Sequence, residues 1–270
     1  MRLNRSLMVS LITGTAAFAS GAGVSTSLWM SLAAWMMAVG GFSLDFNADR
    51  DIDSVGPRSQ IRHNPFTDNS LSPRVGLIIS TVFIIASAVV VILVAPLVLI
   101  PWSITLAVVI AMVLHYFESP LARAFTLGFL QGMHLVIGGT AGNFSTALWL
   151  LAGMFFFAMF GGRGMIDIRD FSQDTVTGVQ TLPKRYGIKR TAQFTAVCLL
   201  VAFALSLAAY FTGEFSVIYL YLDIAFIVIG VFCAWIFATR PSPRLAYYLT
   251  LVFMMGTGSI ICLAMILGSL

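Results

Sequence analysis

The chain has 270 residues, of which 59% are hydrophobic and 10% are charged, with a formal net charge of +4 at pH 7. A soluble domain carries about 25% charged residues, so this composition excludes a soluble globular protein. We expect an integral membrane protein that is surrounded by membrane lipid and has no nucleic acid among its partners.

Apolar segments of about 20 residues, the length that crosses a bilayer core of about 30 Å, recur along the whole chain. Their length favours helices over the alternating strands of an outer-membrane barrel. We predict an all-α integral membrane bundle of nine transmembrane helices, in a single domain over residues 1–270. The predicted spans are residues 7–23, 28–47, 75–97, 99–117, 125–141, 145–165, 191–212, 216–238 and 244–268.

The positions of the fifteen Lys and Arg residues predict the orientation of the bundle. They lie before the first span and at alternate connections after it, whereas the other connections and the C-terminus have none. Nine spans with the N-terminus inside would therefore place every basic residue on the cytoplasmic side, as the positive-inside rule expects. Ala17-Phe18-Ala19-Ser20 resembles a signal-peptide cleavage site, but we expect this span to be retained because the topology needs it.

Seven of the eleven acidic residues lie in two short stretches where long apolar segments end. Carboxylates are costly at a membrane boundary, so this concentration indicates a functional site. The first cluster follows the second span and contains Asp45, Asp49 and Asp53. The second cluster follows the sixth span and contains Asp167, Asp170 and Asp174. Spacings of three and four place the members of each cluster on one side of a continuing helix.

The two clusters, brought together on the cytoplasmic face, would suit Mg²⁺, which prefers carboxylate and phosphate oxygens. We predict that all six carboxylates bind metal and that Asp49, Asp53, Asp170 and Asp174 are catalytic, because bound metal neutralises a diphosphate leaving group. Nearby basic side chains would bind other phosphate oxygens, Arg bidentately and Lys as a point charge. These candidates are Arg62, Arg123, Arg163, Arg169 and Lys184. The alternative for each cluster is a solvated helix end that carries salt bridges.

Two polar segments, at about residues 48–74 and 166–190, interrupt the spans, and each begins with an acidic cluster and continues with basic residues. We predict that both are cytoplasmic loops of the active site, because the chain has no soluble domain large enough for a separate activity. The sequence contains no P-loop, dinucleotide-binding fingerprint or nucleophile elbow.

The paired acidic motifs resemble those of the UbiA superfamily of intramembrane prenyltransferases, which have nine transmembrane helices. The first family motif, N-x-x-x-D-x-x-x-D after helix two, is matched by Asp45, Asp49 and Asp53, with Asp45 where the family usually has Asn. The second, D-x-x-x-D after helix six, is matched by Asp170 and Asp174.

A further segment, from Tyr116 to Arg123, resembles the Tyr…Leu-Lys segment that follows helix four in this family. The resemblance therefore adds Tyr116 to the candidate residues that bind the diphosphate. It also implies a cofactor, Mg²⁺, and two substrates, a polyprenyl diphosphate and a lipophilic acceptor. In this family the diphosphate ionises to an allylic cation, which the acceptor attacks.

The resemblance leaves the acceptor open, because the two motif regions resemble different branches of the family. The candidates are an aromatic acid, a quinone precursor, a chlorin and a glycerophosphate-type lipid. A second enzyme activity, that of a UbiA-type terpene cyclase, would use the same site and quench the cation within its own chain. A cation- or proton-coupled transporter is the alternative from another class, although the acids cluster at one face instead of stepping across the bilayer.

Overall fold

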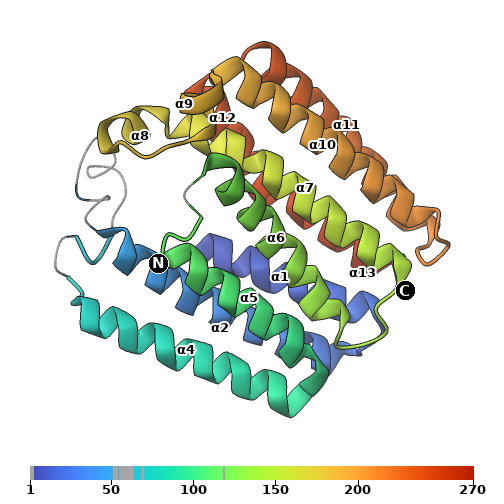
Figure 1. Ribbon diagram of the computed structural model, residues 1–270. Coiled ribbons are helices and arrows are strands. Elements are labelled where there is room, and N and C mark those ends of the chain that lie inside the picture. The colour runs from blue at the N-terminus through green and yellow to red at the C-terminus, as the bar shows by residue number, and fades with distance from the viewer. Residues whose placement is uncertain (1–2, 51–53, 55–63, 68–69, 118) are drawn as a thin grey trace.

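A computed structural model describes residues 3–50, 54, 64–67, 70–117 and 119–270 of the chain, and every regular element in these residues is a helix (Figure 1). Seven of the described helices are long and apolar enough to cross a membrane. Two shorter apolar helices cover Arg5–Ala19 and Gly258–Gly268. The predicted all-α membrane class is therefore confirmed, whereas the count of nine transmembrane helices stays a prediction.

The first half of the bundle contains α1 (Leu3–Ala19), α2 (Val24–Ala48), α4 (Pro73–Val94), the 3-10 turn η2 (Pro96–Val98), α5 (Leu99–Val113) and α6 (Pro120–Gly139). The second half contains α7 (Thr146–Arg169), α8 (Phe171–Thr177), α9 (Leu182–Tyr186), α10 (Ile188–Tyr210) and α11 (Val217–Thr239). The chain then forms α12 (Pro243–Leu251), the π-helical turn η3 (Val252–Thr257) and α13 (Gly258–Gly268). These last three elements follow one another without a break, where the sequence predicted one span.

Serine followed by proline starts three of these helices. The hydroxyls of Ser72, Ser119 and Ser242 each accept a hydrogen bond from a backbone N–H in the first turn of α4, α6 and α12. Proline at the first helical position loses no hydrogen bond, since that N–H has no partner in the helix, and its φ already suits one. These caps explain why the three helices begin earlier than their apolar runs predicted.

Helices that are far apart in the sequence become neighbours in the bundle. Helix α2 lies between α1 and α4, α6 lies between α1 and α7, and α13 packs against both α11 and α1. The N-terminus and α8 lie toward one end of the bundle and the C-terminus lies toward the other (Figure 1). Gly138 of α6 faces the backbone of Thr13 in α1 so closely that a Cβ atom would collide with it. Small residues permit such close approach between membrane helices.

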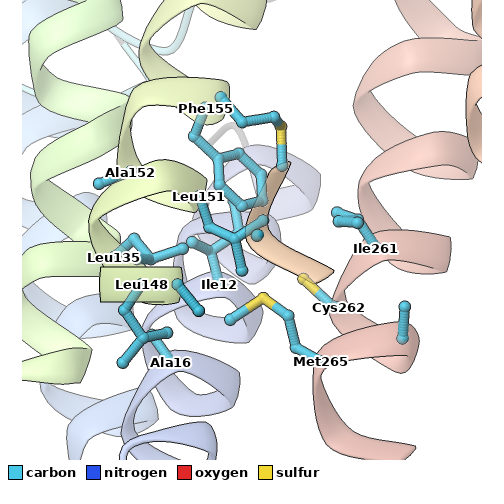
Figure 2. Close-up of a cluster of buried hydrophobic side chains, with 14 of the residues drawn as sticks. Ile12, Ala16, Leu135, Leu148, Leu151, Ala152, Phe155, Ile261, Cys262 and Met265 are labelled. Atoms are coloured by element: carbon cyan, nitrogen blue, oxygen red, sulfur yellow. The ribbon is translucent and has the colours of Figure 1, made fainter. Parts of the chain in front are cut away.

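The largest buried cluster of apolar side chains lies where α1, α6, α7 and α13 meet (Figure 2). Ile12, Phe155 and Ile261 belong both to this cluster and to the wall of the cavity described below. The tightly packed core therefore supports one side of that cavity.

The segment at 166–190, which the sequence predicted as an active-site loop, contains the end of α7 and two short helices. Helix α7 continues to Arg169, and α8 and α9 follow it. Gly178 ends α8 with a left-handed φ of 75°, a conformation that glycine adopts without steric cost. In the other polar segment, buried Asn64 donates a hydrogen bond to the carbonyl of Phe46 at 3.0 Å, which ties the described part of that segment to α2.

Candidate active site

A cavity of about 1210 Å³ lies inside the bundle and has a charged end and an apolar interior. The charged side chains that line it are Arg5, Asp45, Asp49, Arg123, Arg163, Arg169, Asp170 and Asp174. They come from the start of α1, the end of α2, the start of α6, the end of α7 and α8. Apolar side chains of α1, α2, α5, α6, α7, α10, α11, η3 and α13 line the rest.

The carboxylates of the first acidic motif lie where α2 ends. Helix α2 ends at Ala48, and the backbone N–H of Asp49 donates to the carbonyl of Asp45 at 2.9 Å. The two residues are therefore one helical turn apart, and both line the cavity. The third predicted member, Asp53, and the predicted diphosphate ligand Arg62 lie outside the described residues.

The second acidic motif begins where α7 gives way to α8. The N–H of Asp174 donates to the carbonyl of Asp170 at 3.0 Å, so these two carboxylates are also one turn apart, and both line the cavity. Arg169 holds the carboxylate of Asp170 in a two-point contact, with distances of 2.7 Å and 2.6 Å. The predicted spacing within this motif is therefore present in the structure.

Asp167 takes a different position from the other carboxylates. It is 2% exposed and is not among the residues that line the cavity. One oxygen lies 2.6 Å from Nε of Arg163, an ion-pair distance without hydrogen-bond alignment, and the other accepts from the N–H of Leu182 at 3.2 Å. Asp167 lies within α7 and its carboxylate contacts Arg163 and the N–H of Leu182, whereas Asp170, at the end of the helix, lines the cavity.

Arg123 links the acidic residues of several helices. It lies in the first turn of α6, lines the cavity and interacts electrostatically with charges on three other elements. These partners are Asp49, Asp174, Asp167 and Arg163. The structure therefore brings the ends of α2 and α7, the start of α6 and the short helix α8 to one charged site, as the sequence analysis predicted for the two clusters.

Two of the predicted diphosphate-binding residues lie beside this site instead of in its wall. Lys184 donates from Nζ to the backbone carbonyl of Asp174 at 3.3 Å, and it does not line the cavity. Tyr116 is 75% exposed and is likewise absent from the cavity wall. The diphosphate-binding roles of both residues stay predictions.

The donor set at the charged end suits Mg²⁺. Among the described residues, no three His, Cys, Asp or Glu side chains come close enough to form a protein cage for a metal ion. Mg²⁺ does not need such a cage, since it is commonly held by one or two carboxylates together with substrate phosphates and water. Asp45, Asp49, Asp170 and Asp174 all line the cavity, so their oxygens are available to such an ion.

The cavity wall also contains polar side chains that were not predicted as site residues, among them Arg5, Gln131 and His134. The spacing of Arg123, Gln131 and His134 places them along one face of α6. That spacing was visible in the sequence, but it does not say which face of α6 is turned toward the other helices.

The sequence pattern of the UbiA prenyltransferase family matches residues 7–265, so the chain belongs to this family. As a member, it is an enzyme that transfers a prenyl group from a polyprenyl diphosphate to a lipophilic acceptor. It is 28% identical over 219 residues to digeranylgeranylglyceryl phosphate synthase of Natronomonas pharaonis, covering 77% of this chain and 75% of that protein. It is 25% identical over 188 residues to the synthase of the same name from Halobacterium salinarum, covering 70% of this chain and 67% of that protein.

Solved structures share the fold along almost the whole chain. A structure described as digeranylgeranylglyceryl phosphate synthase in membranes matches with a TM-score of 0.79 and 20% identity, covering 99% of this chain and 95% of that one. A UbiA homologue from Aeropyrum pernix K1 matches with a TM-score of 0.76 and 19% identity, covering 97% and 98%. A UbiA homologue from Archaeoglobus fulgidus bound to GPP and Mg²⁺ matches with a TM-score of 0.75 and 14% identity, covering 98% of each chain.

Proposed function

We propose that this prenyltransferase ionises its polyprenyl diphosphate at the charged end of the cavity, with Mg²⁺ as cofactor, and transfers the prenyl group to a glycerophosphate-type lipid. One observation carries this proposal. A single cavity joins the carboxylates of α2 and α8 and the arginines of α6 and α7 to an apolar interior, which matches a substrate with a charged head and a hydrocarbon tail.

The carboxylates of both motifs would hold the metal, which supplies positive charge against the diphosphate as the C–O bond breaks. Asp45 and Asp49 would contribute from α2, and Asp170 and Asp174 from α8, with Asp53 as the remaining ligand predicted from the sequence. We place Asp167 outside this set, because its two oxygens already face Arg163 and the N–H of Leu182.

Arginines would bind the phosphate oxygens that the carboxylate-bound metal leaves free. Arg123, Arg163 and Arg169 line the cavity from the helix ends around the acidic residues. A guanidinium group matches the geometry of a phosphate and can donate two hydrogen bonds to it. Asp167 would act indirectly by holding Arg163 in position.

The interior of the cavity suits a prenyl chain and a second lipophilic substrate. Pockets for single drug-sized ligands have volumes of about 300–1,000 Å³, whereas this cavity has about 1210 Å³. Met154, Phe155 and Met159 of α7 contribute apolar surface there. These walls would exclude water, which protects the allylic cation until the acceptor attacks C1 and loses its proton.

The names of the curated relatives support a glycerophosphate-type acceptor, because their product is a glyceryl phosphate that carries two geranylgeranyl groups. Such an acceptor has a phosphate and a free hydroxyl. Arg5 adds a further positive charge to the cavity wall, at the start of α1, for an anionic headgroup. A labelled product formed by prenylation of an aromatic acid, a quinone precursor or a chlorin would contradict this choice.

We further propose that nine helical segments cross the membrane and that the charged end of the bundle faces the cytoplasm. The apolar helix of α1 and the continuous run from α12 to α13 would supply the two spans beyond the seven long ones. The described lysines and arginines lie in or beside helix ends at the charged end of the bundle, as the positive-inside rule predicts. Reporter fusions at the chain termini would contradict this orientation if they placed the N-terminus outside.

Asp49→Asn and Asp174→Asn test the proposed centre. With labelled geranylgeranyl diphosphate, we expect each variant to lose at least about 100-fold in Mg²⁺-dependent diphosphate release. Asp223→Asn is the matched control, because Asp223 is buried in α11 and does not line the cavity. Full turnover in both motif variants, or unchanged release after chelation of Mg²⁺, would contradict the proposal.

The product separates the competing activities. We expect transfer to geranylgeranylglyceryl phosphate from a panel that also offers an aromatic acid, a quinone precursor and a chlorin. A cyclic hydrocarbon or alcohol formed from the donor alone would establish a terpene cyclase instead. Ion flux in proteoliposomes without transfer to any acceptor would favour a transporter.

A further inference from the structure

Two polar side chains interrupt the apolar wall that α6 contributes to the cavity. Beyond Arg123, this helix lines the cavity with Leu127, Leu130, Gln131 and His134. His134 follows Gln131 by three positions, so the two polar side chains lie on one face of the helix. The wall is therefore charged at its start, apolar for two turns and polar again at Gln131 and His134.

His134 lacks the hydrogen-bond partners that a buried imidazole normally has. Its side chain is 8% exposed, and among the described residues its Nδ1 has no partner. Its backbone carbonyl, in contrast, accepts from the hydroxyl of Thr13 at 3.1 Å, which holds this part of α6 against α1. Buried polar atoms are almost always bonded in folded proteins. A partnerless nitrogen in a cavity wall therefore points to a group that arrives with a substrate.

The polar pair lies between the charged end and the apolar interior. At a rise of about 1.5 Å per residue, Gln131 is about 12 Å and His134 about 16 Å along α6 from Arg123. Helical side chains lean toward the N-terminus of their helix, which on α6 is the charged end. Helix α2 runs in the opposite direction, so Asp45 leans into the cavity. Because the side chains of α6 and α2 incline toward each other in this way, the polar pair and the carboxylates lie closer together than their Cα positions suggest.

The part of the cavity wall that α10, α11 and η3 contribute is apolar, as an isoprenoid tail requires. Phe203 of α10 and Phe226 of α11 line it, with ring centroids 5.2 Å apart in an edge-to-face contact, and Leu199 and Phe253 extend it. An isoprenoid chain has no hydrogen-bonding group. It would pack against these apolar side chains, but it could not provide a hydrogen-bond partner for His134.

We propose that Gln131 and His134 form the acceptor subsite and bind its neutral hydroxyl, while the tail of the donor lies along the wall of Phe203 and Phe226. The inference rests on the proposed function and assigns its two substrates to different parts of the cavity wall. A hydroxyl can donate to Nδ1 of the imidazole and accept from the amide of Gln131, which offers both a donor and an acceptor. Neither side chain is a guanidinium or an ammonium group, so the pair suits a neutral group better than a phosphate.

Steady-state kinetics of His134→Leu and Gln131→Leu test this assignment with labelled geranylgeranyl diphosphate and a dilution series of geranylgeranylglyceryl phosphate. We expect the KM for the acceptor to rise about tenfold in each variant, the size of one lost hydrogen bond to a buried group. The KM for the donor and the release of diphosphate without acceptor should not change. His134→Asn, which keeps hydrogen-bonding atoms, should recover part of the loss.

Thr126→Val is the matched control on the same helix, because Thr126 is buried and polar, bonds the carbonyl of Ala122 and does not line the cavity. Thermal unfolding of the substrate-free protein gives an independent measurement. Removing a partnerless nitrogen should leave the Tm of His134→Leu equal to or above that of the wild type. A purely structural histidine would instead lower the Tm when replaced.

Two results would overturn the inference. One is a rise in the KM for the donor with an unchanged KM for the acceptor, which would assign the α6 wall to the prenyl tail. The other is a Tm of His134→Leu below that of the wild type, together with equal losses of prenyl transfer and of diphosphate release in this variant. If the wild-type protein releases no diphosphate with Mg²⁺, the proposed function fails instead, and the two failures are therefore distinguishable.

Discussion

Arg169 holds the carboxylate of its neighbour Asp170 through two parallel contacts, from Nε to Oδ1 at 2.7 Å and from a terminal nitrogen to Oδ2 at 2.6 Å. Both residues line the cavity. The guanidinium of Arg169 therefore occupies the carboxylate oxygens that the proposed Mg²⁺ site needs. Arg169 and Mg²⁺ would compete for the carboxylate of Asp170. Binding of a diphosphate would resolve this competition by offering Arg169 phosphate oxygens in exchange.

The first prediction concerns this competition. We expect Arg169→Gln to lower the Mg²⁺ concentration for half-maximal activity about threefold to tenfold, because a charge-assisted pair no longer opposes the metal. The KM for the donor should rise in the same variant, since a phosphate ligand is lost. Titration of activity with Mg²⁺ at several donor concentrations measures both effects. Unchanged values for both would show that Arg169 takes no part in the site.

The second prediction separates Asp167 from the metal ligands. Removing one member of a buried ion pair costs about 3 kcal/mol, so Asp167→Ala should lower the Tm by about 10 °C. The variant should retain measurable Mg²⁺-dependent activity well below its Tm, whereas Asp170→Ala should lose activity with a smaller change in Tm. Thermal unfolding and diphosphate release of both variants provide the comparison. An Asp167→Ala protein with a wild-type Tm and no turnover would return Asp167 to the metal site.

The third prediction concerns a buried polar group outside the cavity. The hydroxyl of Ser206 donates to Asp223 at 2.5 Å and lies 3.1 Å from the hydroxyl of Tyr219. Ser206→Ala leaves the carboxyl group without this donor and should cost about 1–3 kcal/mol of stability. Thr239→Val removes an exposed hydroxyl from α11 and is the matched control. Activity per folded molecule should not change in either variant, and its selective loss in Ser206→Ala would connect this group to catalysis.

The fourth prediction tests the contact between α1 and α6. A Cβ atom at Gly138 would collide with the backbone of Thr13 and the side chain of Ala16. Gly138→Ala should therefore separate the two helices and cost about 1–3 kcal/mol, as overpacking does in other cores. Gly256→Ala is the control, since nothing lies within 4 Å of its Cβ position. Equal Tm values for the two variants would show that α1 moves without cost.

Local patterns in the sequence determined the class of the protein and the main features of its acidic motifs. The low charge and the repeated apolar segments indicated membrane helices. In lipid every backbone N–H and C=O group needs a hydrogen-bond partner, and a helix supplies these partners within its own segment. The four-residue spacing of Asp45 and Asp49, and of Asp170 and Asp174, gave neighbours one helical turn apart. These properties depend on a few consecutive residues, so they could be predicted without knowledge of the packing.

Tertiary structure decided which of those side chains face one another. Contacts with Arg163 and with the backbone of Leu182 in α9 engage Asp167, although its spacing to Asp170 suggested one common side. The packing of α6 between α1 and α7 turns Gln131 and His134 into the cavity. Helical periodicity specifies which residues share a face, but contacts with distant helices decide where that face points. For this reason the sequence determined the family, the helices and the two acidic motifs, and only the packed bundle determined the walls of the cavity.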